Sequence, residues 1–166
     1  MKRVIAVSDS HGDVDGLRLA FTQAARHGKI DVAVFLGDGL EDFEAVRPWL
    51  TKQGTLCYGV RGNNDWSASE PREQCFLLGR TRFYLAHGHQ WQVKFGPERL
   101  WYAAREYGAQ VALYGHTHRE CIDLERDVYL INPGSVCERW AGRSAYAEIQ
   151  VEENGYLRPS LHPWED

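Results

Sequence analysis

The sequence predicts an α/β protein, specifically a four-layer αββα sandwich of two mixed sheets flanked by helices. The first third of the chain alternates apolar runs with stretches of helical periodicity, which is typical of βαβ units and a parallel sheet. The later part is rich in short strands separated by turns. Because each part offers one apolar sheet face that must be covered, we expect the βαβ half and the strand-rich C-terminal half to form two sheets that pack together.

The βαβ part contains two successive units with right-handed crossovers. Its expected elements are a strand over 2–8, a helix from 14 to a stop at 28, a strand over 31–37, a helix over 43–50 and a strand over 56–60. Pro48 lies inside the second helix, so we expect that helix to be short, kinked or late-starting.

The strand-rich part begins with a β-hairpin around a tight turn at 79–81. A helix follows, with Pro97 well placed as its first residue and Gly108 as its stop. The expected strands of this part cover 76–78, 82–85, 111–114, 120–124, 128–131, 145–151 and 156–161.

Length and composition indicate one soluble domain over residues 1–166. The net charge of −4 argues against general nucleic-acid binding. No apolar run suits a signal peptide or a membrane span, so we expect a cytoplasmic protein without membrane contact. The four cysteines form no C-x-x-C pair, which favours reduced, mostly buried thiols over a metal knuckle or a redox motif.

The distribution of histidine along the chain is more informative about function than that of cysteine. Five of the seven histidines fall in three short clusters at residues 9–11, 87–89 and 116–118, each bordered by turn residues. The other two, His27 and His162, are expected on the surface.

Four polar clusters directly follow expected strands, at residues 9–11, 37–38, 62–63 and 115–118. In an open α/β sheet the ligand crevice lies beyond the carboxyl ends of the strands, so these clusters can converge. Together they offer carboxylate, amide and imidazole donors. This mixed oxygen and nitrogen set suits Mn, Fe, Ni or Zn better than Mg or Ca.

Each cluster alone has an ordinary alternative. Asp9-Ser10-His11 can be a helix start capped by Ser10 or Asp13, and the clusters at 37–39 and 62–65 can be simple turns. His116 and His118 can point into one cavity if the backbone is extended, or they can face solvent at a sheet edge.

Taken together, the order D-x-H, G-D, G-N, H-G-H, G-H-x-H resembles the calcineurin-like metallophosphoesterase superfamily along almost the whole chain. The short length, the lack of a cap domain and the sequence at 131–135, Ile-Asn-Pro-Gly-Ser, resemble its compact YfcE-like phosphodiesterase branch.

The resemblance implies two divalent metal ions. One is expected on Asp9, His11 and His118, and the second on Asn63, His87 and His116, with Asp38 bridging both. Mn²⁺ is the expected ion, and Ni²⁺, Fe²⁺ and Zn²⁺ are alternatives. A water between the ions would be the nucleophile, and nearby carbonyls, or carboxylates such as Asp65, would orient the imidazoles.

Two further residues are candidate catalytic residues. Larger members of the superfamily have a histidine, thought to protonate the leaving group, where this chain has Asn64. An amide cannot act as a general acid near neutral pH, so phosphodiesters with good leaving groups are favoured over alkyl phosphomonoesters. His89 can contact the substrate phosphate or orient its loop.

The sequence gives weaker evidence for a functional role of other side chains near the motifs. Arg61 and Arg119 can neutralise phosphate charge or be merely solvated. Trp66, Trp91 and Trp140 can stack on a nucleobase, but a place in the core or in a subunit interface is favoured.

The expected function is therefore hydrolysis of a small phosphodiester, of which a nucleotide is one candidate, by a protein that can be a homo-oligomer. The rival expectations are a non-catalytic scaffold of the same fold, like the retromer subunit, and a regulatory nucleotide-binding module. The presence of Asp9, His11 and Asp38 favours the enzyme.

Overall fold

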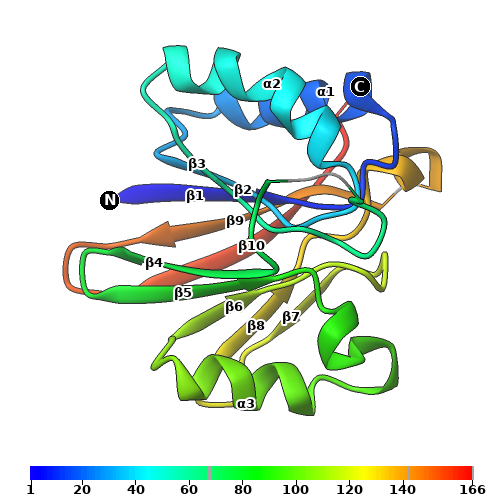
Figure 1. The fold of residues 1–166 in the computed structure, drawn as a ribbon. Helices are drawn as coiled ribbons and strands as arrows, with labels where there is room; N and C mark the ends of the chain where they lie inside the picture. Colours follow the sequence, from blue (N-terminus) through cyan, green and yellow to red (C-terminus); the bar gives the residue numbers. More distant parts are fainter. Residues whose placement is uncertain (67–68, 142, 166) are drawn as a thin grey trace.

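The computed structural model describes residues 1–66, 69–141 and 143–165, which are arranged in four layers (Figure 1). The helices are α1 (Val14–Arg26), α2 (Leu40–Lys52) and α3 (Glu98–Glu106), with short 3-10 helices at His89–Trp91, Val93–Phe95 and Val136–Ala141. The strands are β1 (Lys2–Val7), β2 (Val32–Phe35), β3 (Leu56–Gly59), β4 (Glu73–Leu78), β5 (Thr81–Ala86), β6 (Val111–Leu113), β7 (Cys121–Asp123), β8 (Tyr129–Asn132), β9 (Ser144–Val151) and β10 (Leu157–Pro163).

Each sheet mixes parallel and antiparallel pairs. The first has the strand order β10-β9-β1-β2-β3 and the second β4-β5-β6-β8-β7. Strands β1, β2 and β3 are parallel, as are β5, β6 and β8. Helices α1 and α2 cover the outer face of the first sheet, and α3 covers the outer face of the second (Figure 1). The expected αββα sandwich is confirmed.

The alternation of side chains along β1 explains the layering. Val4 and Ala6 point into the core between the two sheets, whereas Ile5 and Val7 pack beneath the helices. All four are buried, because successive side chains of a strand point to opposite faces and both faces of this sheet are covered.

The division of strands between the sheets differs from the expectation. Strands β9 and β10 return to the first sheet, where β9 pairs antiparallel with β1, and the second sheet comprises strands from 73–132. A buried ion pair favours this pairing: Arg3 of β1 donates to Glu148 of β9 through Nε at 3.1 Å and Nη2 at 2.5 Å. The same guanidinium donates to the carbonyl of Ala24 in α1, which ties the helix to the sheet.

Two helix boundaries also differ. Helix α2 starts earlier than expected and runs through Pro48. The proline lies on the exposed face, where water can bind the Glu44 carbonyl that lacks an amide partner. Pro97 precedes α3 as its N-cap residue and is not its first helical residue.

Two expectations about burial are wrong. His162 is half-buried, because its ring stacks on Tyr146 with the centroids 4.7 Å apart. The cysteines are free thiols, but Cys121 is exposed and the other three are half-buried.

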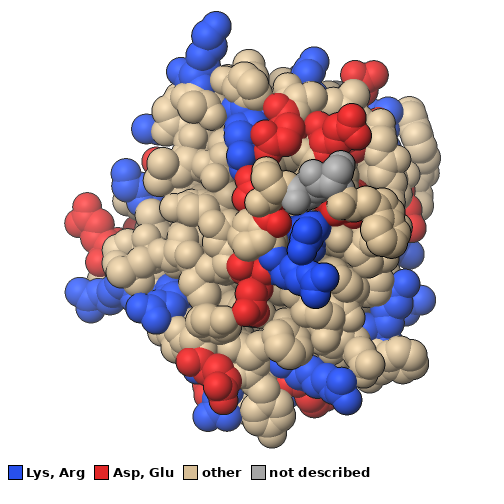
Figure 2. Space-filling view, in the orientation of Figure 1, with Lys and Arg blue, Asp and Glu red and all other residues tan. Residues whose placement is uncertain are grey.

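Charge is mixed on the face drawn in Figure 2, where lysine and arginine side chains stand in small groups among acidic ones. None of the helices in the described ranges combines the length and apolarity needed to cross a bilayer.

Candidate metal centre

The polar clusters meet where the parallel strands of both sheets end. Asp9 follows β1, Asp38 follows β2, and His87 directly follows β5, so three loops from two sheets converge. Backbone hydrogen bonds join the loops: Asp9 N–H donates to the Gly37 carbonyl at 3.0 Å, and His11 N–H donates to the Asp38 carbonyl at 3.0 Å. The other two expected clusters join them, because Asn64 N–H, next to the cluster at 62–63, donates to Asp38 and His116 N–H donates to Asp9. The convergence expected from sequence is therefore present.

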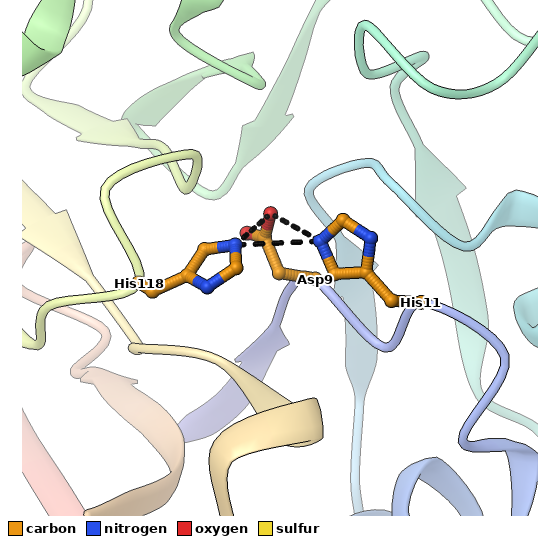
Figure 3. Close-up of side chains that lie close together, drawn as sticks. All are labelled: Asp9, His11 and His118. Atoms are coloured by element: carbon orange, nitrogen blue, oxygen red, sulfur yellow. Dashed lines mark hydrogen bonds and ion pairs between the residues drawn. The ribbon is translucent and has the colours of Figure 1, made fainter.

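One group consists of Asp9, His11 and His118, whose ligand atoms lie within 4.8 Å of one another. The Asp9 carboxylate stands between two imidazoles that face each other (Figure 3). Asp9 Oδ1 lies 3.2 Å from His118 Nε2 and 3.5 Å from His11 Nε2, and the two Nε2 atoms are 3.3 Å apart.

The second group consists of Asp38, His87 and His116, again within 4.8 Å. Asp38 Oδ2 lies 3.3 Å from His87 Nε2. The rings of His87 and His116 meet edge to face with centroids 5.0 Å apart.

Two carboxylates connect the groups. Asp38 Oδ2 lies 3.7 Å from His11 Nε2 of the first group, and Asp9 Oδ1 lies 3.8 Å from His87 Nε2 of the second. An ion in either group would therefore lie near both carboxylates, so the arrangement can hold two adjacent cations.

The backbone at these residues is unusual. In the described ranges, six non-glycine residues have positive φ, and five of them belong to the two groups: Asp9 (55°), His11 (44°), Asp38 (59°), His116 (70°) and His118 (61°). Such conformations cost of order 1–3 kcal/mol each and concentrate at functional sites. The positive φ angles of His116 and His118 also show that this segment is not extended, and the two rings belong to different groups, as the family resemblance implies.

Glycines let the loops approach closely. A Cβ at Gly37, where φ is 103°, would lie 2.7 Å from His87 Nδ1. A Cβ at Gly115 would lie 2.6 Å from Asp9 Oδ2 and would overlap Ser8 Oγ. The glycines of the G-D and G-H-x-H motifs thus make room for the candidate ligands.

Burial and neighbouring charges shift the pKa values of several residues of the two groups. Burial alone would raise the pKa of Asp38, but His87 and Asn64 stabilise its anion and lower the pKa to about 2. The pKa of His118 rises to about 9, chiefly through its contact with Asp9 and against the effect of burial. Burial and the neighbouring His87 lower the pKa of His116 to about 4, so this imidazole is neutral at pH 7.

The hydrogen bonds around His87 show whether the residues of the site fit a metal ion. Its Nδ1 lies 2.7 Å from the Leu36 carbonyl, which only accepts, so Nδ1 carries a proton and donates it. Its Nε2 is buried without a hydrogen-bond partner in the described residues, and it faces the carboxylates of Asp38 and Asp9. Burial alone would lower the pKa of His87, but Asp38 and Asp9 raise it, so this position favours positive charge at Nε2. In the neutral imidazole the Nε2 lone pair points at the same place as the two carboxylates, so a metal ion can take the place of the Nε2 proton. The donor set fits a divalent transition metal.

Several supporting residues were not identified from sequence as part of the site. His118 Nδ1 lies 3.0 Å from Glu138 Oε1, which fixes the ring and leaves Nε2 facing Asp9. Ser135 Oγ donates to the Asp9 carbonyl at 2.9 Å, and Asn132 Nδ2 donates to the Gly115 carbonyl at 3.1 Å. The sequence at 131–135 supplied a signal for the last two, whereas Glu138 lies in no motif.

Asp65 has a different role from the one expected. Its carboxylate accepts hydrogen bonds from backbone amides and from no imidazole in the described residues. The donors are the N–H groups of Asp38, Gly39, Leu40 and Gly62, at 2.7 to 3.1 Å. Asp65 therefore holds the Asp38 loop and the start of α2 in place.

The remaining candidates lie beside the two groups. Asn64 donates to Asp38 through its backbone N–H and through Nδ2, both at 2.9 Å. Asn63 and His89 line a neighbouring cavity together with Arg61. The His89 ring centroid lies 5.3 Å from that of His87.

Outside the centre, Arg119 lines a cleft with His116 and His118. The tryptophans differ among themselves. Trp66 and Trp140 are 89% and 84% exposed, which excludes both from the core. Trp91 is partly buried and donates to Tyr84 Oη at 2.9 Å.

A two-sheet sandwich with paired carboxylate and imidazole groups at its strand ends defines a candidate dinuclear metalloprotein. The chain belongs to the calcineurin-like phosphoesterase superfamily, because the family model for the calcineurin-like phosphoesterase superfamily domain matches residues 1–154. The family resemblance seen in the motifs is thus confirmed.

Relatives named as phosphoesterases share most of the chain. A probable metallophosphoesterase of Bacillus subtilis, YsnB, is 30% identical over 153 residues, covering 91% of this chain and 85% of YsnB. The phosphodiesterase YfcE of Escherichia coli K12 is 29% identical over 156 residues, covering 82% and 80%.

Solved structures agree on the fold. A predicted phosphoesterase from Streptococcus pneumoniae TIGR4 superposes with a TM-score of 0.71 at 26% identity, covering 97% of this chain and 98% of the other. Vps29 of Chaetomium thermophilum gives 0.72 at 19% identity, covering 98% and 97%, and shares the fold alone.

Proposed function

We propose that this protein is a dinuclear metal-dependent phosphodiesterase that hydrolyses small phosphodiesters. The observation that carries the proposal is the pair of carboxylate and imidazole groups connected by Asp9 and Asp38. Asp9, His11 and His118 would hold one ion, and His87, His116 and Asn63 the other, with Asp38 between them. Two such ions lower the pKa of a water between them and stabilise charge on the phosphoryl oxygens.

The chain's own hydroxyl groups support attack by water rather than by a side chain. Ser8 Oγ donates to the Asp9 carboxylate, Ser10 Oγ donates to Asp42 at 2.6 Å, and Ser135 Oγ donates to the Asp9 carbonyl. Each of these hydroxyls holds a loop, and all three serines are 0% exposed, so none can reach a substrate phosphorus as the nucleophile.

The preference for diesters rests on Asn64. Its amide donates to Asp38 and carries no acidic proton, so it stabilises the carboxylate and cannot protonate a departing alkoxide. Diesters with acidic leaving alcohols need no such proton. Trp66, exposed and lining a cavity with Asn63, offers a stacking surface that suits a nucleotide diester.

Mn²⁺ is the ion we propose, with Ni²⁺, Fe²⁺ and Zn²⁺ as alternatives, because each accepts mixed imidazole and carboxylate ligands. The competing function is a scaffold like Vps29, whose fold this chain shares. A scaffold does not need His87 Nε2 to be left facing two carboxylates.

The test is elemental analysis of the purified protein, followed by chelation and reloading with each ion. Turnover is then measured with bis(4-nitrophenyl) phosphate and with the monoester 4-nitrophenyl phosphate. We expect two ions per chain and faster hydrolysis of the diester. Protein that binds no ion and hydrolyses neither ester would instead be a scaffold.

A further inference from the structure

A cavity of about 290 Å³ adjoins the candidate centre and contains two arginines. It is lined by Arg61, Gly62, Asn63, Asp65, Trp66, Arg72 and His89. Arg61 lies two residues after β3 of the first sheet, and Arg72 immediately precedes β4 of the second, so segments next to both sheets each place one guanidinium at this cavity.

Within the described ranges, neither guanidinium makes an ion pair with a carboxylate. Asp65 is the only acidic residue among those lining the cavity, and its oxygens accept from four backbone amides. Two guanidinium groups beside a single carboxylate leave an excess of positive charge in the cavity, so the cavity favours an anion.

His89 supplies a third polar group. Its Nδ1 is buried without a hydrogen-bond partner in the described part of the chain. An imidazole beside two guanidinium groups can complete the hydrogen bonding of a phosphate.

The cleft on the other side of the candidate centre has a different balance of positive and negative side chains. A second cleft contains Lys94, Arg119 and Arg143, but it also contains Glu138. Arg143 lies 3.8 Å from Glu138 and 3.6 Å from Glu120, so part of that positive charge is already neutralised. The arginine cavity differs from this cleft in that His89, with a buried ring nitrogen that has no hydrogen-bond partner in the described residues, lies beside its two guanidinium groups.

We propose that Arg61, Arg72 and His89 bind a second phosphate group of the substrate, so the preferred substrate is a diester that also bears a phosphomonoester. This inference rests on the proposed function, because the scissile phosphate would lie at the neighbouring candidate centre. Guanidinium groups match the geometry of phosphate oxygens and bind them through paired charge-assisted hydrogen bonds.

The test compares two chromogenic substrates with the same leaving group. They are thymidine 5′-(4-nitrophenyl phosphate) and the same ester carrying a 3′-phosphate. We expect wild-type kcat/KM to be higher for the 3′-phosphorylated ester. Arg61→Gln and Arg72→Gln, made separately, should each reduce that preference by about 10- to 100-fold, the usual effect of losing a charged hydrogen-bond partner.

Two variants serve as controls for charge. In the first sheet, Arg158 of β10 and Arg3 of β1 both lie opposite Gln150 of β9, so Arg158 is level with the amino end of β1. The candidate centre lies beyond the carboxyl end of β1. Arg158→Gln should therefore keep the wild-type preference. Lys94→Gln makes the same change of charge in the second cleft. If Lys94→Gln lost the preference for the 3′-phosphorylated ester and both arginine variants kept it, the second phosphate would bind in the Lys94 cleft. That result would overturn the proposal.

A binding measurement separates this inference from the proposed function. Calorimetry with the chelated protein should show tighter binding of thymidine 3′,5′-bisphosphate than of thymidine, and each arginine variant should weaken it. Equal kcat/KM for the two esters, with active hydrolysis of bis(4-nitrophenyl) phosphate, would overturn the second-phosphate site alone. Absence of all diester hydrolysis would overturn the proposed function, while calorimetry would still decide whether the arginines bind phosphate.

Discussion

Asp38 lies where one carboxylate reaches imidazoles of both groups, at 3.3 Å from His87 Nε2 and 3.7 Å from His11 Nε2. In the proposed function Asn63, in contrast, is a ligand of one ion only. We therefore expect Asp38→Asn to lose more turnover than Asn63→Ala, because the bridging charge offsets the repulsion between two cations. Turnover and metal stoichiometry by elemental analysis provide the measurement. Equal metal loss in both variants would contradict the bridging assignment.

Asn64 occupies the position of the family's expected proton donor, yet its amide hydrogen-bonds to Asp38. We expect kcat/KM of the wild type to fall steeply as the pKa of the leaving alcohol rises. Asn64→His should flatten this dependence, because a positioned general acid contributes typically about 100- to 10,000-fold where protonation limits the rate. The measurement is a series of substituted phenyl and alkyl esters at matched metal occupancy. Coinciding slopes would mean that another group supplies the proton or that residue 64 does not face the leaving group.

At the residue scale, sequence identified the residue types of the site but not their conformations. Asp9, His11 and Asp38 could be selected because each follows a strand whose carboxyl end lies at one sheet edge. The left-handed backbone of His118 could not be predicted, because non-glycine residues adopt it only when the surrounding structure enforces it. Glu138 was missed because its contact with His118 depends on the three-dimensional path of a distant segment.

At the scale of loops, Gly37 controls how closely two strand ends approach. Gly37→Ala combines an unfavourable φ with a contact of 2.7 Å between the new Cβ and His87 Nδ1. Gly79→Ala is the matched control, since that residue also has positive φ but has open space around it. We expect Gly37→Ala to lower the free energy of unfolding by roughly 2 kcal/mol more than Gly79→Ala. Urea unfolding measures the difference, and Mn²⁺ titration should show weaker binding only in Gly37→Ala. If both variants lost the same free energy of unfolding, His87 would move away from the new Cβ without loss of stability.

The order of strands in the sheets shows where sequence patterns stop being informative. The turn at 79–80 fixes the pairing of β4 with β5 locally, so the hairpin was predicted correctly. The return of β9 to β1 depends on contacts between residues more than 140 positions apart, such as Arg3 with Glu148. No local signal marks such a pairing, because an apolar strand fits the inner face of either sheet.

For the whole molecule, metal binding and folding should be coupled. The acidic and imidazole groups come from loops after β1, β2, β5 and β6, so they are assembled only in the folded chain. A ligand that binds only the folded state at 100 times its Kd adds about 2.7 kcal/mol to the free energy of unfolding. We expect Mn²⁺ to raise Tm and a chelator to lower it, as measured by thermal unfolding. Asp38→Asn should show a smaller rise, and an equal rise would indicate that the ion binds elsewhere.

The buried pair of Arg3 and Glu148 should make global stability depend on pH. Both side chains are buried, at 5% and 4% exposure. Burial alone would raise the pKa of Glu148, but hydrogen bonds from Arg3 and Gln150 lower it below its ordinary value of 4.5. The unfolded state therefore binds this proton more readily than the folded state does. Its contribution to stability is fully present above pH 4.5 and is lost as the pH falls through the lowered pKa.

Glu148→Gln tests this contribution. At pH 7 the variant should be about 3 kcal/mol less stable than the wild type, because the Arg3 guanidinium stays buried without its counter-charge. As the pH falls from 7 to 3, the wild type should lose stability faster than the variant, so the difference should narrow. Glu153→Gln, a change at an exposed carboxylate, should follow the wild-type profile. The measurement is urea unfolding of the three chelated proteins across this range. Parallel profiles for the wild type and Glu148→Gln would show that Glu148 keeps an ordinary pKa, and that the pair contributes no pH-dependent stability to the contact between β1 and β9.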